Sequence, residues 1–333
     1  MRAHETGTKV RGDNDAMGKS EFKRKGSVVK AVRRQAVGHV DRLLELLDHG
    51  RLTAGQRAAA RSEARALASL IETVRGPLGP EVVRRELRWL KRLRATLAGA
   101  AGPAAGDETG WRAEAEELGL STEAAARVAA ACVASASGRE SGGEPPTSAR
   151  PTRATETGND ADGAAPPDPV LLRRRADVAE ARMRARHWHL PTGDFDLLAP
   201  GLRRSYGRAR QHAAAWRDAD DAGHTDALPA AAALAEALGQ WAVALRRLEK
   251  AWPEVLKPTR KATQDAADLA HRCARLGRLQ ASSAGHDPAA DAALQEAADH
   301  ARRNLRPALD RLLVESPPAT VKRIEAYWRA WRG

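Results

Sequence analysis

The sequence is poor in the side chains that β-sheets favour. Phe and Tyr occur only twice each in 333 residues, whereas alanine is abundant. Strands favour β-branched and aromatic residues, so this composition argues against a β-sandwich or a parallel sheet. We therefore predict an all-α chain.

The marks of membrane, secreted and metal-bound proteins are also scarce. No uninterrupted run of about 18 apolar residues is present, so we expect no membrane span. The N-terminal segment has no apolar stretch of the kind that a secretory signal needs. The two cysteines, Cys132 and Cys273, form no CxxC pair, which is typical of a cytosolic chain with inert thiols. We expect a cytoplasmic protein.

Positive charge is in excess. Lys and Arg number 55 against 43 Asp and Glu, a formal net charge of +12, and the isoelectric point is about 10.3. A surplus of this sign predicts an anionic partner.

Composition and periodicity divide the chain into four parts. Residues 1–26 are polar and aperiodic and are predicted to be a disordered basic tail. Apolar residues recur at helical spacing in residues 27–134, the predicted first helical lobe. Residues 135–168 hold almost no bulky apolar side chain and are predicted to be a disordered linker. Residues 169–333 form the predicted second lobe, so we expect two helical-bundle lobes joined by a linker.

Several helix ends carry recognisable signals. Ser27 and Thr53 are expected to cap helices, and Asp287 and Ser316 each precede a proline at a first helical position. Pro307 is expected to kink or split its helix. In the second lobe, helices are expected at about 169–187, 199–217, 228–250, 253–279, 288–314 and 317–332.

One helix of the second lobe carries arginines and no acid between Gly201 and Trp216. Residues three and four apart share a helical face, so Arg203, Tyr206 and Arg210 are expected to line one wall. Arg204 and Arg208 would lie at its edge. The planar guanidinium binds phosphate oxygens in pairs, and the tyrosine hydroxyl adds a donor. The alternative is a solvated basic face.

The same segment carries a family resemblance. LLAPGLRRSYGRAR (Leu197 to Arg210) resembles the motif that opens the second half of CHAD domains, the conserved-histidine α-helical domains. AWPEVLKP (Ala251 to Pro258) and RIEAYWRAWR (Arg323 to Arg332) are similar to two further CHAD segments, in the same order. VRGPLGPEVVRREL, in the first lobe, is a weaker match to the first CHAD repeat. The resemblance spans roughly residues 28–100 and 169–332.

The resemblance implies a fold of tandem four-helix-bundle repeats around a basic cavity that binds inorganic polyphosphate, in some proteins at polyphosphate granules. The chain would be a divergent member that lacks most of the family's histidines. Those positions fall near Ala58 and Ala232, and Glu236 and Gly239 are among the residues that replace the second repeat's basic ladder.

Patterns for other chemistry are missing. Asp265, Asp268 and His271 share a helical spacing, but no second motif completes a metal site of the di-metal bundle type. The sequence holds no GxxxxGK[ST], GxGxxG, HExxH or GxSxG, so nucleotide binding and the common hydrolase sites lack support. We expect no cofactor, no metal and no enzymatic activity.

The leading hypothesis is therefore non-enzymatic binding of inorganic polyphosphate in a basic cavity between the lobes. One alternative is a decayed CHAD scaffold that serves as a structural or protein-interaction module. Another is a nucleic-acid binder that contacts phosphates without base readout. The candidate polyphosphate-binding residues are Arg203, Arg204, Tyr206, Arg208 and Arg210, then Lys257, Lys261, Lys322, Arg323, Arg329 and Arg332, and in the first lobe Arg61, Arg65, Arg84, Arg85 and Arg88.

Overall fold

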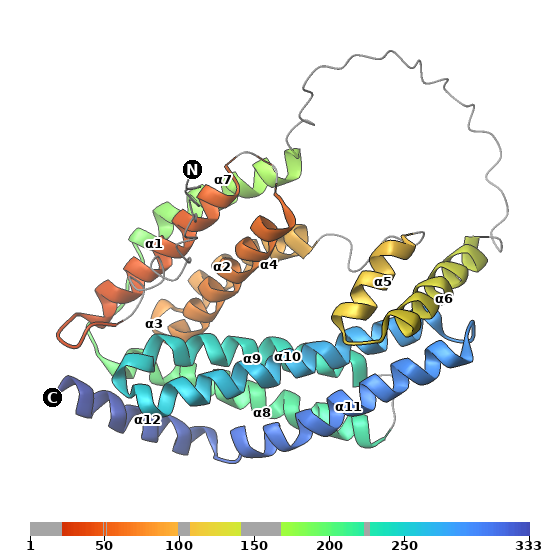
Figure 1. Ribbon diagram of the computed structural model, residues 1–333. Coiled ribbons are helices and arrows are strands. Elements are labelled where there is room, and N and C mark those ends of the chain that lie inside the picture. The colour runs from red at the N-terminus through yellow and green to blue at the C-terminus, as the bar shows by residue number, and fades with distance from the viewer. Residues whose placement is uncertain (1–21, 49, 51, 99–106, 141–167, 223–226) are drawn as a thin grey trace, which may run out of the picture.

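All regular structure in the part of the chain that the structure describes is helical (Figure 1), which confirms the all-α prediction. The structure is a computed structural model, and it describes residues 22–48, 50, 52–98, 107–140, 168–222 and 227–333. The α-helices are α1 (Val28–Leu46), α2 (Ala54–Thr73), α3 (Arg75–Leu78), α4 (Pro80–Ala98), α5 (Glu108–Glu117), α6 (Thr122–Glu140), α7 (Pro169–Arg186), α8 (Ala199–Asp221), α9 (Ala227–Leu248), α10 (Pro253–Ser283), α11 (Pro288–Leu312) and α12 (Pro317–Arg332).

The predicted caps begin their helices. The Ser27 side chain accepts a hydrogen bond from the backbone of α1, and Thr53 forms a reciprocal capping box with Gln56 at the start of α2. Asp287 and Ser316 cap α11 and α12, each followed by proline in the first turn. These side chains satisfy backbone N–H groups that have no partner within the helix.

Pro307 does not split its helix, because α11 runs unbroken from Pro288 to Leu312. Of the expected kink or split, the split does not occur. Pro307 lies on the exposed side of α11, where water can satisfy the carbonyl group that loses its N–H partner.

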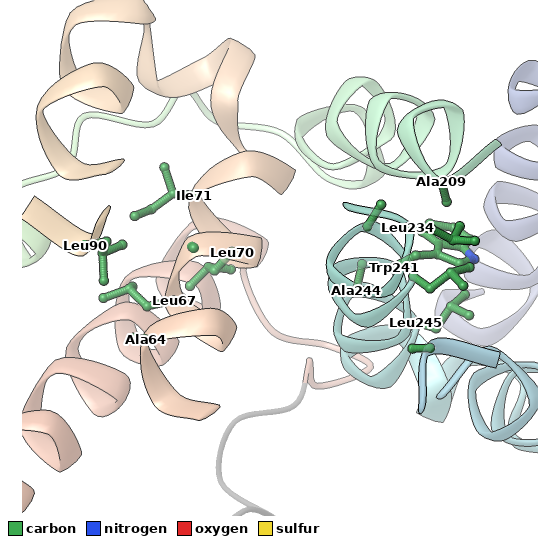
Figure 2. Close-up of a cluster of buried hydrophobic side chains, with 14 of the residues drawn as sticks. Ala64, Leu67, Leu70, Ile71, Leu90, Ala209, Leu234, Trp241, Ala244 and Leu245 are labelled. Atoms are coloured by element: carbon green, nitrogen blue, oxygen red, sulfur yellow. The ribbon is translucent and has the colours of Figure 1, made fainter. Parts of the chain in front are cut away.

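Helix α9 lies among α8, α10 and α2, and it supplies much of the core. Figure 2 shows Leu234, Trp241 and Leu245 gathered on α9, and Ile71 and Leu90 gathered between α2 and α4. By length and composition, residues 227–251 are the one stretch in the described chain that would suffice to span a bilayer, and half of it is buried in the fold. Packing against three helices accounts for its apolar composition.

The helices on either side of the predicted linker pack against distant partners. Helix α7, which follows the linker, lies along α1, whereas α6, which precedes it, lies against α10 and α11 (Figure 1). An ion pair between Arg182 and Asp41 supports the contact of α7 with α1. Arg275 of α10 binds Glu114 of α5, the helix that packs against α6. The packing of these helices thus crosses the boundary that composition indicates.

The predicted tail and linker are described only at their edges. Residues 1–21 and 141–167 lie outside the described part of the chain, while residues 135–140 continue α6. Phe22 is 4% exposed, and its ring meets that of Trp328 edge to face at 5.3 Å. Residues 22–26 are therefore part of the folded protein, because an apolar side chain anchors them to α12.

Candidate functional site

A basic cleft of about 610 Å³ lies between α2 and α4, and Gln240 of α9 also lines it. We call it the α2–α4 cleft. Four cations and one acid line it, together with apolar side chains. The lining residues are Arg61, Arg65, Ala68, Glu72, Leu87, Leu90, Lys91, Arg94, Ala95 and Gln240.

Helical spacing brings these cations to facing walls. Arg61 and Arg65 are four residues apart on α2, and Lys91 and Arg94 are three apart on α4, so each pair shares one face of its helix. The buried stripe next to them, which includes Leu67 of α2 and Leu90 of α4, packs the two helices together. The apolar contact therefore sets the orientation of the charged faces.

Glu236 of α9 is the counter-ion of this cleft. Its carboxylate lies 2.9 Å from an Arg94 nitrogen and 3.7 Å from Nε of Arg65. It therefore partly neutralises one cation from each wall. Because the carboxylate is only partly buried, water screens both pairs and an incoming polyanion can compete with it.

Glu72 is the acid that lines the cleft. Arg75 donates two hydrogen bonds to it, at 2.8 and 2.9 Å, and an Arg208 nitrogen lies 3.9 Å from its carboxylate. Arg208 also donates to Oε1 of Gln240 at 3.3 Å. Arg208 thus reaches the edge of the cleft from α8, and it does so beside two residues that line the cleft.

Arg61 and Arg65 line the cleft and Arg208 reaches its edge, and all three are among the predicted site residues. Lys91 and Arg94 were not among the candidate ligands, although they lie on the basic helix that contains Arg88. Their three-residue spacing was visible in the sequence, but nothing there showed which face of α4 meets α2.

The predicted wall of Arg203, Tyr206 and Arg210 does not form. Tyr206 is 2% exposed, and its hydroxyl donates to the carbonyl oxygens of Leu312 and Glu315, at 3.3 Å each. Helix α8 turns this face toward α9 and α12, so the tyrosine belongs to the core and its hydroxyl is already used. Arg203 and Arg204 are exposed, and Arg210 is half-buried.

The candidates at the start of α4 lie outside the cleft lining. Arg84, Arg85 and Arg88 are exposed. Arg84 pairs with Glu81, and Nε of Arg85 lies 3.4 Å from Glu86. Their charges are therefore available to solvent.

The candidates on α10 and α12 also lie apart from the cleft lining. Lys257, Lys261 and Lys322 are exposed. The remaining three each contact an acid, as Arg323 binds Glu315 at 3.0 Å, Arg329 binds Glu325, and Arg332 binds Asp194 at 3.2 Å. Arg332 also lies over the Trp328 ring, 5.5 Å from its centroid.

Burial shifts the pKa values of both cysteines and of His271. Burial raises the pKa of both Cys132 and Cys273 to about 11, so their thiols stay protonated at neutral pH. Burial, supported by Arg275, lowers the pKa of His271. Among the described residues, no three His, Cys, Asp or Glu side chains are grouped to hold a metal ion.

Comparison with known proteins gives no match. No family model, no curated protein and no solved structure matches the chain.

Proposed function

We propose that the protein binds inorganic polyphosphate in the α2–α4 cleft of a CHAD-like helical fold and catalyses no reaction on it. The observation that carries the proposal is the cleft itself, where Arg61, Arg65, Lys91 and Arg94 converge from two helices on one open volume. A chain of phosphates presents repeated charges at short spacing, and guanidinium groups bind such oxygens in pairs.

The resemblance of three segments to CHAD domains supports the same ligand. The segment Leu197 to Arg210 starts at the last residue of the 3-10 helix η2 (Phe195–Leu197) and continues into α8. Arg208 of this segment reaches the edge of the cleft. We propose that residues 27–134 contain the first, degenerate repeat and residues 169–333 the second. The proposed location is the cytoplasm, at polyphosphate granules.

Binding should depend strongly on salt. Each neutralised cation contributes roughly 0.7 to the slope of log affinity against log salt for a flexible single-stranded polyanion. Four cations line the cleft, so we expect a slope of about −3. Contact with only one or two surface arginines would give a shallower slope, so the measured slope distinguishes binding by the whole cleft from binding by single arginines.

The test is calorimetric titration with long-chain polyphosphate and, in parallel, a duplex oligonucleotide, at two salt concentrations. We expect polyphosphate to bind more tightly, and the double variant Lys91→Gln/Arg94→Gln to lose about half of the salt slope. Arg112→Gln/Arg127→Gln is the matched control, because these exposed arginines of α5 and α6 each pair with an acid one helical turn away.

Three results would contradict the proposal. If no binding of polyphosphate is measured at low salt, the proposed function is wrong. Equal affinity for both polymers identifies a general polyanion binder, and an equal loss in the control variant shows that total charge, not the cleft, decides binding. The first result would leave a structural or protein-interaction role for the scaffold.

Substitution of Glu236 should raise the affinity for polyphosphate, whereas substitution of the cleft cations should lower it. Glu236→Gln keeps the size of the side chain but removes the charge that competes for Arg65 and Arg94. We expect polyphosphate to bind several-fold more tightly, because two exposed ion pairs of at most about 1 kcal/mol each no longer need to be displaced. Unchanged or weaker binding would show that the ligand does not enter this cleft.

A further inference from the structure

A second cavity, of about 240 Å³, lies among α1, α2, α9 and α10, on the side of α2 that faces α1. We call it the α1–α9 cavity. It shares Arg65 with the α2–α4 cleft and is otherwise lined by different residues. Arg42, Arg246 and Arg247 supply its other cations, and Glu63 is its only acid among the described residues that line it. Its walls therefore carry a surplus of positive charge.

Arg247 is the unusual residue of this cavity, because it is a buried cation. It is 7% exposed, and its guanidinium donates to Oγ of Ser69 at 3.1 Å and to the carbonyl oxygen of Ala66. Both acceptors are neutral, and no carboxylate among the described residues forms an ion pair with Arg247. Burial lowers its pKa to about 9, which still leaves it protonated at pH 7. A buried charge without a counter-ion is costly.

Gln35 is the second unusual residue. It is 2% exposed and lines the cavity, yet neither its amide nitrogen nor its amide oxygen has a hydrogen-bond partner. Buried amide groups are nearly always paired. An amide offers one donor group and one acceptor, so a ligand that satisfies Gln35 should present both.

The acid in the cavity is already occupied. Glu63 accepts from Nδ1 of His39 at 2.7 Å and lies 3.1 Å from Nε of Arg42. It therefore balances the charge near α1 and leaves the charge of Arg246 and Arg247, on α9, without an acid in the wall. The unbalanced charge and the unpaired amide line the same cavity.

From these observations we infer that the α1–α9 cavity binds a phosphate group that retains a hydroxyl, through Arg246, Arg247 and Gln35. At pH 7 hydrogen phosphate presents charged oxygens that accept from guanidinium and amide N–H groups, and its hydroxyl donates to the amide oxygen. Sulfate has no such donor. The cavity is less than half the volume of the α2–α4 cleft, which suits a single group rather than a long chain.

This inference does not depend on polyphosphate binding, and its test leaves Arg65 unchanged. The full chain is titrated calorimetrically with inorganic phosphate, methyl phosphate, sulfate and chloride at constant ionic strength, and thermal unfolding is followed in each salt. We expect phosphate to bind and to raise the unfolding temperature more than sulfate or chloride does, because a ligand that binds only the folded state stabilises it. At pH 7 methyl phosphate is mostly a dianion without a hydroxyl, so it cannot donate to the amide oxygen of Gln35 and should bind more weakly than inorganic phosphate. Equal binding of the two would show that the hydroxyl is not used and would overturn the inference.

Gln35→Leu is the decisive variant, because it removes the amide and keeps the arginines. We expect phosphate affinity to fall about tenfold or more, the value of a hydrogen bond to a charged group, while the protein without ligand is as stable as before or more so. Gln295→Leu on α11, where the glutamine is exposed, is the matched control and should bind phosphate normally.

Arg246→Gln provides a second variant that does not disturb the buried guanidinium, because Arg246 is exposed. It should weaken phosphate binding by a similar factor. The inference is overturned if phosphate and sulfate act alike, if no phosphate binding is measured, or if Gln35→Leu leaves the affinity unchanged. Each of these results would make Arg247 a structural link between α9 and α2.

Discussion

Replacement of Gly201 by alanine tests the helix crossing that holds Arg208 at the edge of the cleft. Gly201 lies in the first turn of α8, directly against the backbone of Thr73 in α2. A β-carbon at this position would lie well inside 3.0 Å of the Thr73 carbonyl group and Cα atom, a separation that β-carbons essentially never have. Since both partners are backbone, the helices must move apart.

The expected cost follows from the rigidity of the contact. Overpacking typically costs 1–3 kcal/mol, and this contact involves main-chain atoms that cannot change rotamer, so we expect about 3 kcal/mol of destabilisation. Alanine recovers roughly 0.5–1 kcal/mol of helix propensity relative to glycine. The net loss in the free energy of unfolding is therefore about 2 kcal/mol.

Gly207, on the same helix, is the matched control. A β-carbon there would meet only Cγ of Pro317, at 3.6 Å, an ordinary van der Waals contact. Gly207→Ala should therefore stabilise the protein by about 0.5–1 kcal/mol. Urea denaturation of both variants, with the slopes of the transitions compared, gives the two free energies. If Gly201→Ala is as stable as Gly207→Ala, α8 does not cross α2 at this distance.

Two further predictions concern buried charge. Arg184→Met removes the cation that binds the carboxylate of Glu86, only 1% exposed, at 2.8 Å and leaves it the more distant Arg85 at 3.4 Å. Urea denaturation should therefore show a loss of about 2 kcal/mol, less than for a buried charge left without any cation. Arg186→Met, an exposed position on the same helix, should change stability by less than about 0.5 kcal/mol, and equal effects would refute the pairing. Burial lowers the pKa of His39 below its usual value near 6.5, against the opposing effect of Glu63. Folding therefore favours the neutral form, so the stability that is present above about pH 6.5 should be lost progressively as the pH falls below that value. His39→Gln should flatten this dependence of the urea midpoint on pH, and an unchanged dependence would contradict the assignment.

Helix positions were predictable because their signals are local. Ser27, Thr53, Asp287 and Ser316 act on backbone groups within three residues of themselves, and each begins its helix where the sequence indicates. Trp241 is likewise buried on the apolar stripe of its helix. These features depend on residues one turn apart, so no knowledge of tertiary packing was needed.

The pairing of helices was not predictable in the same way. Composition marks where the chain has little apolar surface, at residues 135–168, but it does not say which helices meet across that segment. The contact of α1 with α7 brings together residues more than 120 positions apart, such as Asp48 and Arg175. Ion pairs of this kind become visible only once the partner helix is known.

The arginine-rich motif on α8 shows the same limit at the site. A helical repeat places Arg203, Tyr206 and Arg210 on one face, but it does not show whether that face meets solvent, a cavity or another helix. The apolar ring of Tyr206 settles the question, because it packs against Trp241 at 5.3 Å between ring centroids. In a mixed row of arginine and tyrosine, burial of the aromatic side chain therefore outweighs solvation of the basic ones, and the basic side chains remain at the margins of that face.

Glu236 has a different effect on the charge of the cleft in the structure than the sequence suggests. In the sequence it stands only as an acid where the resemblance expects a base, which suggests a loss of binding. In the structure the same carboxylate lies between Arg65 and Arg94, which come from two other helices. If the protein binds polyphosphate as proposed, this carboxylate competes with the anion for both cations. The affinity would then depend on how readily the ligand displaces a screened, partly exposed ion pair, so salt concentration and the charge at position 236 would control the same equilibrium.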